Sequence, residues 1–309
     1  RARLATAGVA GLAAAVTLAA VLVAGGDEPR TVRPTMPELP PRTNPIDIAW
    51  AADGVLHLRS VDVELPGITE VFDVAPVADD GTYGAVVTGW DGKDIDVVHV
   101  LHVDATGEVT EIGTAPLSEG DRLVGSASET IVAWVEGLGD TREAVAYDTA
   151  RARELGRTPL PALPRDKSAR RATEPVAVDD GTVYLSSPDG HLTWVPGSAP
   201  TTYDAGGALL LDVAAGVRLV GAADFETVTF GPPDGSADHT VPGGGGTLGL
   251  SPDGRHVLPG TRHGFVTSEP SRYEVLRTDT GGLVELDISP DSAVEGAALS
   301  DDFVTYVVG

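Results

Sequence analysis

From residue 46 to residue 309, apolar residues come in short runs and lack the three- and four-residue spacing of an amphipathic helix. The runs are rich in Val, Thr, Tyr and Leu, and Gly, Pro, Asp or Asn interrupts them about every 8–12 residues. This pattern predicts an all-β domain. One hairpin recurs, in which a tight acidic or glycine turn separates a strand of small residues from a β-branched strand. Its copies are 73–87 (DVAPVADDGTYGAVV), 122–135 (RLVGSASETIVAWV), 174–185 (EPVAVDDGTVYL), 210–220 (LLDVAAGVRLV), 247–258 (TLGLSPDGRHVL) and 294–308 (VEGAALSDDFVTYVV).

A second hairpin lies between these copies, at 102–112, 147–155 and 277–286. In each, an Asp opens the turn and an acid follows six or seven residues later. This spacing predicts that the two acids pair in register: Asp104 with Glu111, Asp148 with Glu154, and Asp279 with Glu285.

The two hairpins together make a four-stranded unit that repeats every 35–52 residues, which predicts the blades of a β-propeller. The terminal hairpins at 46–58 and 294–308 can join and complete one blade from both ends of the chain, which removes a free sheet edge. That arrangement gives six blades. If the 46–58 hairpin is a blade of its own, the count is seven.

Residues 4–26 (LATAGVAGLAAAVTLAAVLVAGG) carry no charge, and a helix of roughly 20 apolar residues crosses a bilayer core. We interpret residues 1–26 as a transmembrane helix that acts as a signal anchor. A cleaved signal peptide is the alternative, but its apolar region is usually only about 7–15 residues long. A buried helix of a soluble protein is disfavoured because every face is apolar. Arg1 and Arg3 precede the segment and acids follow it, so the N-terminus is expected in the cytoplasm and the remaining chain outside.

Residues 27–45 contain six prolines, and proline favours an extended spacer. They are expected to be a linker between the membrane segment and a single domain at 46–309. This domain carries 16 Lys and Arg residues against 43 Asp and Glu residues, a net charge of −27. Such a charge disfavours nucleic-acid binding, because phosphates are repelled. The chain has no cysteine, so its fold depends on neither disulfides nor thiolate metal sites.

Residues 250–255 (LSPDGR) resemble the SPDG repeat of TolB-like and WD40-like bacterial propellers, and 300–302 (SDD) and 179–181 (DDG) resemble degenerate copies of it. The layout of one membrane span, a Pro-rich tether and a propeller also resembles membrane-anchored envelope proteins of actinobacteria. The resemblance implies a propeller fold, a place in the envelope and binding to other proteins. It transfers no catalytic residue, because the matching positions are structural turns.

Residues 151–171 (RARELGRTPLPALPRDKSARR) are unusually basic for an acidic domain. We expect them to form a loop that docks an anionic partner, such as an acidic protein face, a wall polymer or lipid headgroups. Mere compensation of the local acidic field is the alternative. The cations are Arg151, Arg153, Arg157, Arg165, Lys167, Arg170 and Arg171.

Asp91, Asp94 and Asp96 lie within six residues of a glycine-containing turn, which makes them a weak candidate Ca²⁺ site. Their spacing is irregular and no bidentate Glu follows, so a solvated turn is the more ordinary interpretation. His99 and His102 lie three residues apart in a strand, so their side chains are expected on opposite faces. No GxSxG, HExxH or phosphate-loop pattern is present in the sequence.

These features predict a membrane-anchored, extracytoplasmic propeller that acts as a non-catalytic protein-binding or sensing scaffold. No cofactor is expected apart from the candidate Ca²⁺. The alternative is a propeller hydrolase or lyase with carboxylates at the central channel, where propellers place such sites.

Overall fold

The computed structural model of the chain describes residues 49–52, 54–58, 61–79, 82–93, 96–117, 123–126, 128–161, 172–187, 190–205, 209–222, 226–242, 249–258, 275–284, 294–299 and 304–308. These residues form β-strands, turns and the short 3₁₀ turn η2 (Gly139–Thr141). The predicted membrane helix at 1–26 and linker at 27–45 lie outside them. Within the described ranges there is no helix long and apolar enough to cross a membrane.

Five antiparallel sheets of four strands make up most of this part of the chain. In each sheet the strands follow one another in chain order. Their bounds are β4 (Glu70–Asp79), β5 (Thr82–Trp90), β6 (Val97–Val103) and β7 (Val109–Pro116); β8 (Val124–Gly125), β9 (Ile131–Glu136), β10 (Glu143–Asp148) and β11 (Arg153–Pro159); β12 (Glu174–Asp179), β13 (Thr182–Ser187), β14 (Gly190–Trp194) and β15 (Thr201–Tyr203); β16 (Leu209–Ala214), β17 (Val217–Gly221), β18 (Thr227–Gly231) and β19 (His239–Pro242); and β20 (Gly249–Leu250), β21 (His256–Leu258), β22 (Val275–Arg277) and β23 (Leu283–Val284).

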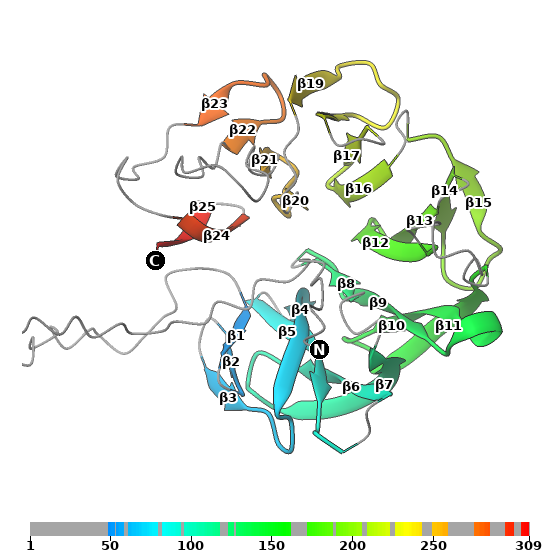
Figure 1. The fold of residues 1–309 in the computed structure, drawn as a ribbon, viewed down its shortest axis with the longest axis vertical. Coiled ribbons are helices and arrows are strands. Elements are labelled where there is room, and N and C mark those ends of the chain that lie inside the picture. Colours follow the sequence, from blue (N-terminus) through cyan, green and yellow to red (C-terminus); the bar gives the residue numbers. More distant parts are fainter. Residues whose placement is uncertain are drawn as a thin grey trace, which may run out of the picture.

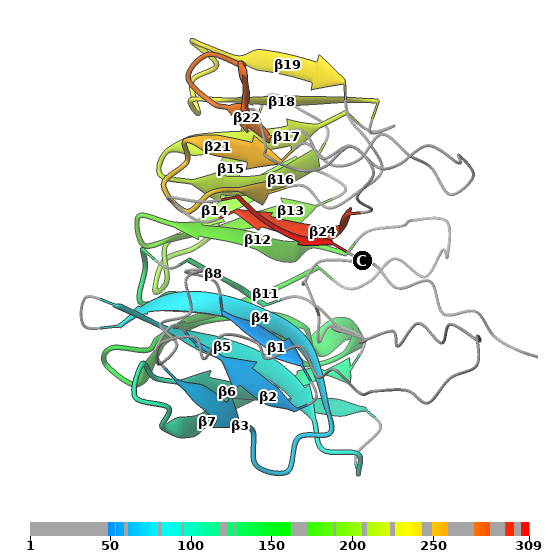
Figure 2. The ribbon, with the colours of Figure 1, turned by 90° about the vertical axis from the view of Figure 1, so that its left-hand side faces the viewer.

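Two smaller sheets lie at the ends of the described chain. One contains β1 (Trp50–Ala52), β2 (Val55–His57) and β3 (Asp62–Glu64), and the other contains β24 (Val294–Leu299) and β25 (Val304–Val308). Figure 1 shows all the sheets arranged in a ring, with the first strand of each four-stranded sheet nearest its centre. Seen from the side, neighbouring sheets stack face to face (Figure 2). The all-β fold is therefore a β-propeller, as the repeat predicts.

The up-and-down order of each sheet gives the ring two different faces. The first and third turns of every four-stranded sheet lie at one end of its strands, which we call the turn face. The second turn and the connection to the next sheet lie at the other end, which we call the linker face. Any two positions separated by a full strand are therefore on opposite faces of the ring.

The inner hairpins form as the sequence predicts. All six copies of the repeat fold into antiparallel pairs: β4–β5, β8–β9, β12–β13, β16–β17, β20–β21 and β24–β25. The turn between β16 and β17 shows why, because Gly216 takes a φ of +72° that closes a two-residue loop. The 46–58 segment contributes the hairpin β1–β2 and continues into a third strand, β3.

The predicted register of the outer hairpins is wrong. Glu111 lies opposite Leu101, and Glu154 lies opposite Tyr147. The short turn decides this, because the Asp104 carboxylate accepts the N–H groups of Thr106 and Glu108, each at 2.9 Å, and fixes the strands that leave the turn. Glu285, the third predicted partner, lies outside the described residues.

The core is a series of apolar layers between consecutive sheets. In one layer, buried Val77 and Val98 of the β4–β7 sheet pack with Trp134 and Val145 of the next sheet. Trp134 is 1 % exposed, and its indole N–H donates to the Thr114 carbonyl of the preceding sheet at 3.2 Å. Each layer thus joins two sheets and not the two faces of one sheet, as a propeller requires.

Candidate functional site

Two aspartates near the centre of the ring bond one sheet to the next. In β4 an extra residue, Phe72, bulges out of the ladder just before Asp73, and in β16 Leu211 does the same before Asp212. Each bulge allows the following carboxylate to accept the N–H of its own next residue, at 2.9 Å for Asp73 and 2.8 Å for Asp212.

The second oxygen of each carboxylate crosses to the neighbouring sheet. Asp73 accepts the N–H of Leu123, which precedes β8, at 3.4 Å. Asp212 accepts the N–H of Leu250 in β20 at 2.8 Å. Each aspartate thus follows a bulge and makes the same kind of bond pair, although Asp73 lies near the start of β4 and Asp212 near the end of β16.

Two further carboxylates make similar bonds at the turn face. Asp179, the last residue of β12, accepts the N–H groups of Ala215 and Gly216 in the next sheet at 2.8 and 2.9 Å. Glu129, in the β8–β9 turn, accepts backbone N–H groups of Asp180 and Gly181. We call Asp73, Glu129, Asp179 and Asp212 the inner carboxylates.

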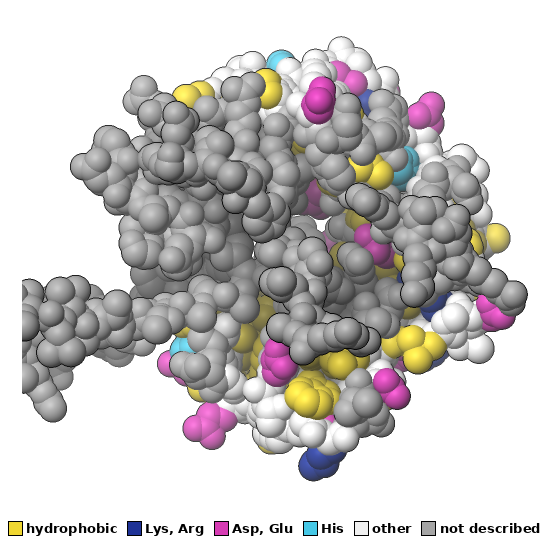
Figure 3. All heavy atoms as spheres, in the orientation of Figure 1, with side chains coloured by type: hydrophobic (Ala, Val, Ile, Leu, Met, Phe, Trp, Pro, Cys, Tyr) yellow, Lys and Arg dark blue, Asp and Glu magenta, His cyan; other side chains and the backbone are white. Residues whose placement is uncertain are grey.

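Burial changes the pKa of two of the inner carboxylates, Glu129 and Asp212. Burial raises the pKa of Asp212 to about 6, its backbone hydrogen bonds oppose this shift, and the charge of Asp179 adds to it. Burial also raises the pKa of Glu129, and the charges of Asp179 and Asp180 reinforce that rise. Chemically, the four groups are acceptors committed to the backbone of a neighbouring sheet, and acidic side chains are visible in the middle of the ring as well as at its edge (Figure 3).

Sequence reasoning missed the inner carboxylates, although a signal exists. An apolar residue, Asp, Val or Ile, and a small residue recur at 46–49 (IDIA), 72–75 (FDVA), 211–214 (LDVA) and 286–289 (LDIS). The two copies within the described residues carry Asp73 and Asp212. The alternation of apolar and polar residues does not distinguish these aspartates, because an Asp in an apolar strand also fits an ordinary solvent-facing position.

The basic segment at 151–171 does not form one loop. Arg151 lies in the β10–β11 turn at the turn face, and Arg153 and Arg157 belong to strand β11. Leu160 follows the opposite end of that strand, at the linker face. A seven-residue strand is roughly 20 Å long, so Arg151 and Leu160 lie on opposite faces of the ring. Arg165, Lys167, Arg170 and Arg171 lie outside the described residues, and their docking role stays a prediction.

Arg157 is surrounded by carboxylates. Its guanidinium donates to Glu154 at 2.9 and 2.8 Å, donates to Glu136, and lies 3.7 Å from Glu143. Glu136 and Glu143 are directly opposite each other on β9 and β10, so the positive charge of Arg157 reduces the repulsion between these two carboxylates. Hydrogen bonding by Glu154 is the main cause that raises the pKa of Arg157. Arg157 is therefore a structural cation, whereas Arg151 pairs with Asp148.

A buried arginine fixes both ends of the segment that carries the remaining cations. Arg142 is 1 % exposed and lies at the linker face, just before β10. Its carbonyl accepts the N–H of Leu160 at 2.9 Å, and its Nη2 donates to the carbonyl of Thr173 at 3.1 Å. Leu160 and Thr173 therefore lie close together on the linker face, both bonded to one residue.

The candidate Ca²⁺ residues are only partly described. Asp91 accepts hydrogen bonds from the backbone N–H and the Nζ of Lys93 at 2.9 and 3.1 Å. Asp94 lies outside the described residues. Over the described ranges, no three His, Asp or Glu side chains are placed to hold a metal ion. The Ca²⁺ site stays a prediction.

His99 and His102 have different surroundings. His99 bonds Glu111 on the next strand, with 3.1 Å between Nδ1 and Oε1. His102 is partly buried, and this burial lowers its pKa, whereas the charges of Asp79 and Asp104 raise it. Neither residue belongs to a nucleophile–base pair in the described structure.

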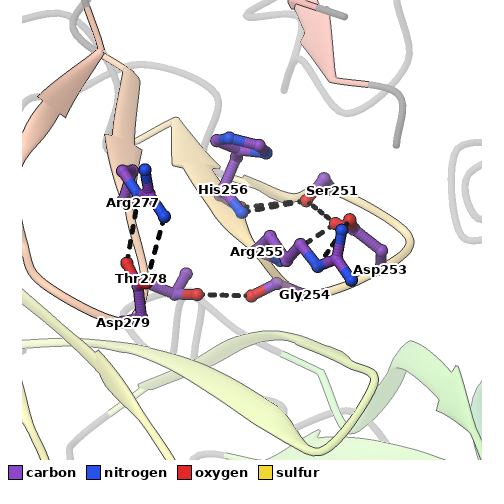
Figure 4. A network of polar contacts seen from close by, with 8 residues as sticks. All are labelled: Ser251, Asp253, Gly254, Arg255, His256, Arg277, Thr278 and Asp279. Atoms are coloured by element: carbon purple, nitrogen blue, oxygen red, sulfur yellow. Dashed lines mark hydrogen bonds and ion pairs between the residues drawn. The ribbon is translucent and has the colours of Figure 1, made fainter. Parts of the chain in front are cut away.

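The SPDG motif at 251–254 forms the turn between β20 and β21, as Figure 4 shows. Ser251 is fully buried; its hydroxyl donates to Asp253 at 2.7 Å and accepts the N–H of His256 at 3.0 Å. Gly254 takes a φ of +67°, and its carbonyl accepts the Thr278 hydroxyl at 2.6 Å. The motif is therefore a structural turn, as the resemblance implies.

No family model matches the chain, and no curated protein matches it. Among solved structures, it is similar to TolB from Acinetobacter baumannii (11 % identity, TM-score 0.47, covering 68 % of this chain and 52 % of TolB). It is also similar to hydrazine synthase from Kuenenia stuttgartiensis (14 %, 0.44, covering 76 % and 71 %) and to the β-propeller domain of the Trilobed protease from Pyrococcus furiosus (10 %, 0.37, covering 82 % and 68 %). The chain spans about half the length of TolB. Its own ring of sheets identifies it as a β-propeller, and TolB is among the propellers that it resembles.

Proposed function

We propose that this chain is a non-catalytic scaffold that binds a partner protein outside the membrane, to which the helix at 1–26 anchors it. The observation that carries this proposal is the use of the inner carboxylates. Propeller enzymes place reactive groups at the centre of the ring, but here Asp73, Asp179 and Asp212 each accept backbone N–H groups of the next sheet. Acids used in this way stabilise a rigid ring, which suits a binding platform.

The candidate docking element is the segment that Arg142 holds at both ends. Leu160 and Thr173, which flank this segment, are both bonded to Arg142 at the linker face, and four cations at 165–171 give the segment a positive charge on an acidic domain. We expect the partner to present an acidic face. An anionic lipid or wall polymer is the competing outcome of the test.

The propeller is proposed to close with six blades, the terminal sheets β1–β3 and β24–β25 together completing the ring, and seven blades are the alternative. β24 packs against β20 and β21, and β1 packs against β4. Both terminal sheets therefore flank the same opening in the ring.

Cross-linking of the intact chain in its native membrane tests the proposal. We expect a partner protein that is recovered at low salt and lost in high salt, since the attraction is electrostatic. Recovery of lipid or polymer alone would replace the protein partner. Deletion of residues 4–26 should move the chain from the membrane fraction to the soluble one, and retention in the membrane would contradict the anchor.

One observation favours an enzyme as the second candidate. Asp212 lies on an innermost strand of the ring, where propellers place carboxylate sites, and burial raises its pKa to about 6. Hydrolase or lyase activity in the purified chain that disappears in Asp212→Asn, while the variant keeps its fold, would favour this alternative over the scaffold.

A further inference from the structure

The sheet β1–β3 has one apolar face and one face that carries aromatic and acidic side chains. Its apolar face packs on the neighbouring β4–β7 sheet (Figure 1), in the layer that contains Leu56, Val63 and Val87. On the other face, Trp50 and Val55 are only partly buried, and neither belongs to an apolar layer of the described residues. We call this second face, which carries Trp50, Val55, His57, Asp62 and Glu64, the Trp50 face.

Two rows of side chains cross the Trp50 face. In the first row, the rings of Trp50 and His57 stack with 3.8 Å between their centroids, and His57 Nδ1 lies 2.7 Å from Asp62 Oδ1. In the second row, Val55 on β2 lies opposite Glu64 on β3. The Asp62 side chain is 58 % exposed, and Glu64 is exposed as well. The face is therefore an aromatic surface with two carboxylates along its β3 side.

The linker that leads into β1 has a complementary composition. Residues 29–45 carry three arginines, Arg30, Arg33 and Arg42, against one acid, Glu38. They also contain six prolines, and a proline-rich chain binds aromatic side chains at a small cost in entropy. An arginine guanidinium stacks on aromatic rings and pairs with carboxylates. The Trp50 face offers both kinds of group.

The linker is also near enough and long enough to reach this face. It ends at Pro45, five residues before Trp50, and the pair Asn44–Pro45 favours a turn. Seven residues of polyproline chain span about 20 Å, whereas three adjacent strands span about 10 Å. Because the linker is covalently attached, its effective concentration at the face is about millimolar, an advantage that a separate partner does not have.

We propose that residues 39–45 of the linker fold back on the Trp50 face, with Arg42 at the carboxylates of Asp62 and Glu64 and the prolines against the Trp50–His57 stack. The inference does not depend on the scaffold function. A bound linker covers one wall of the opening that the terminal sheets flank, and it fixes the orientation of the propeller relative to the predicted membrane helix. Residues 27–38 then remain as the spacer.

Limited trypsin digestion of the intact chain tests whether Arg42 is held on the face. A bound segment resists cleavage, because proteolysis requires the segment to open. Removal of the two carboxylates, by Asp62→Asn with Glu64→Gln, should raise the rate of cleavage after Arg42 about tenfold. The matched control removes the same charge from exposed acids elsewhere, by Glu108→Gln with Asp140→Asn, and should leave the rate unchanged. Equal rates in the unmodified chain and both variants overturn the proposal.

Photocrosslinking identifies what covers the face. The chain has no cysteine, so Leu39→Cys gives a single attachment site for a benzophenone label. Crosslinks to residues 50–64 of the same chain support the proposal. Crosslinks only to a second copy, recognised by mixing ¹⁵N-labelled and unlabelled chains, or only to another protein or to lipid overturn it.

A variant of the aromatic stack completes the test. Trp50→Ala should remove at least 90 % of the crosslinks to residues 50–64. Its matched control is Leu283→Ala, which truncates a side chain that is 59 % exposed in another sheet and should leave the crosslinks in place. If Trp50→Ala does not fold, the crosslink map of the labelled chain with Trp50 intact decides, and a map without residues 50–64 overturns the proposal.

Discussion

Gly254 lies so close to Ala214 that a Cβ built on the glycine would be 2.5 Å from the Ala214 carbonyl oxygen. The contact joins the SPDG turn of one sheet to the β16–β17 hairpin of the sheet before it. Because the obstacle is backbone, it cannot rotate away. The SPDG turn is thus also a point of close contact between the β16–β19 and β20–β23 sheets.

Gly254→Ala should lower the free energy of unfolding by about 2–4 kcal/mol, because it adds an overpacked contact to an unfavourable backbone angle. Gly216→Ala is the matched control. Gly216 has a similar φ of +72°, but nothing lies within 4 Å of its added Cβ, so only the backbone cost of about 1 kcal/mol remains. Urea unfolding of both variants measures the difference, and equal destabilisation would contradict the predicted contact.

The Arg218–Asp238 pair should behave as an ion pair with one buried member, because the Asp238 side chain is 31 % exposed. The Arg218 side chain is 4 % exposed and donates to both carboxylate oxygens at 2.8 and 2.9 Å. Asp238→Ala should cost about 3 kcal/mol, because it leaves a buried charge unpaired. The double variant with Arg218→Met should recover part of that loss. A double variant that is less stable than Asp238→Ala would contradict this account.

The same pair predicts that the folded state loses stability at acidic pH. The hydrogen bonds from Arg218 lower the pKa of Asp238. A carboxyl group with a lowered pKa in the folded state stabilises that state above its unfolded pKa near 4, and the stability is lost as the pH falls further. Asp238→Asn should flatten thermal stability between pH 4 and pH 2 relative to the unmodified chain. An unchanged acid limb would show that other carboxyl groups control it.

Arg157→Gln should destabilise the chain by about 1 kcal/mol at low salt, because Glu136 and Glu143 then repel each other without a cation between them. The loss should shrink in 0.5 M salt, which screens the repulsion. Arg153→Gln, on the same strand, should change stability by less than about 0.5 kcal/mol. A loss at Arg157 that does not depend on salt would point to packing of the side-chain stem instead.

The hairpins could be predicted from the sequence because their signals are local. An Asp-Gly or Ala-Gly pair between two apolar runs determines its own turn, and no distant residue is needed to form the β16–β17 pair. Register is different. The hydrogen bonds of the turn, such as those from Thr106 and Glu108 to Asp104, decide which side chains lie opposite each other. The six- or seven-residue spacing of acids along the chain therefore led to the wrong prediction that Asp104 pairs with Glu111.

The candidate site was harder to predict for a related reason. The role of Asp212 depends on the N–H of Leu250, which lies 38 residues away in another sheet. The charge of the basic segment was visible in the sequence, but its division by β11 into two faces was not, because that requires knowing which end of the strand each arginine occupies. Likewise, nothing local marks Arg142 as a buried residue that bonds both Leu160 and Thr173.

The scaffold account is tested most directly by comparing partner capture between two charge variants. The first replaces Arg165, Lys167, Arg170 and Arg171, which lie between Leu160 and Thr173 in the sequence, with Gln. The second, its control, replaces Arg151, Arg153, Arg255 and Arg277, which lie in or beside turns of the turn face and carry the same total charge. With both variants cross-linked in the native membrane, the account predicts that the first loses at least 90 % of the captured partner and the second keeps most of it. Equal capture by both variants, or a loss confined to the second, would contradict it.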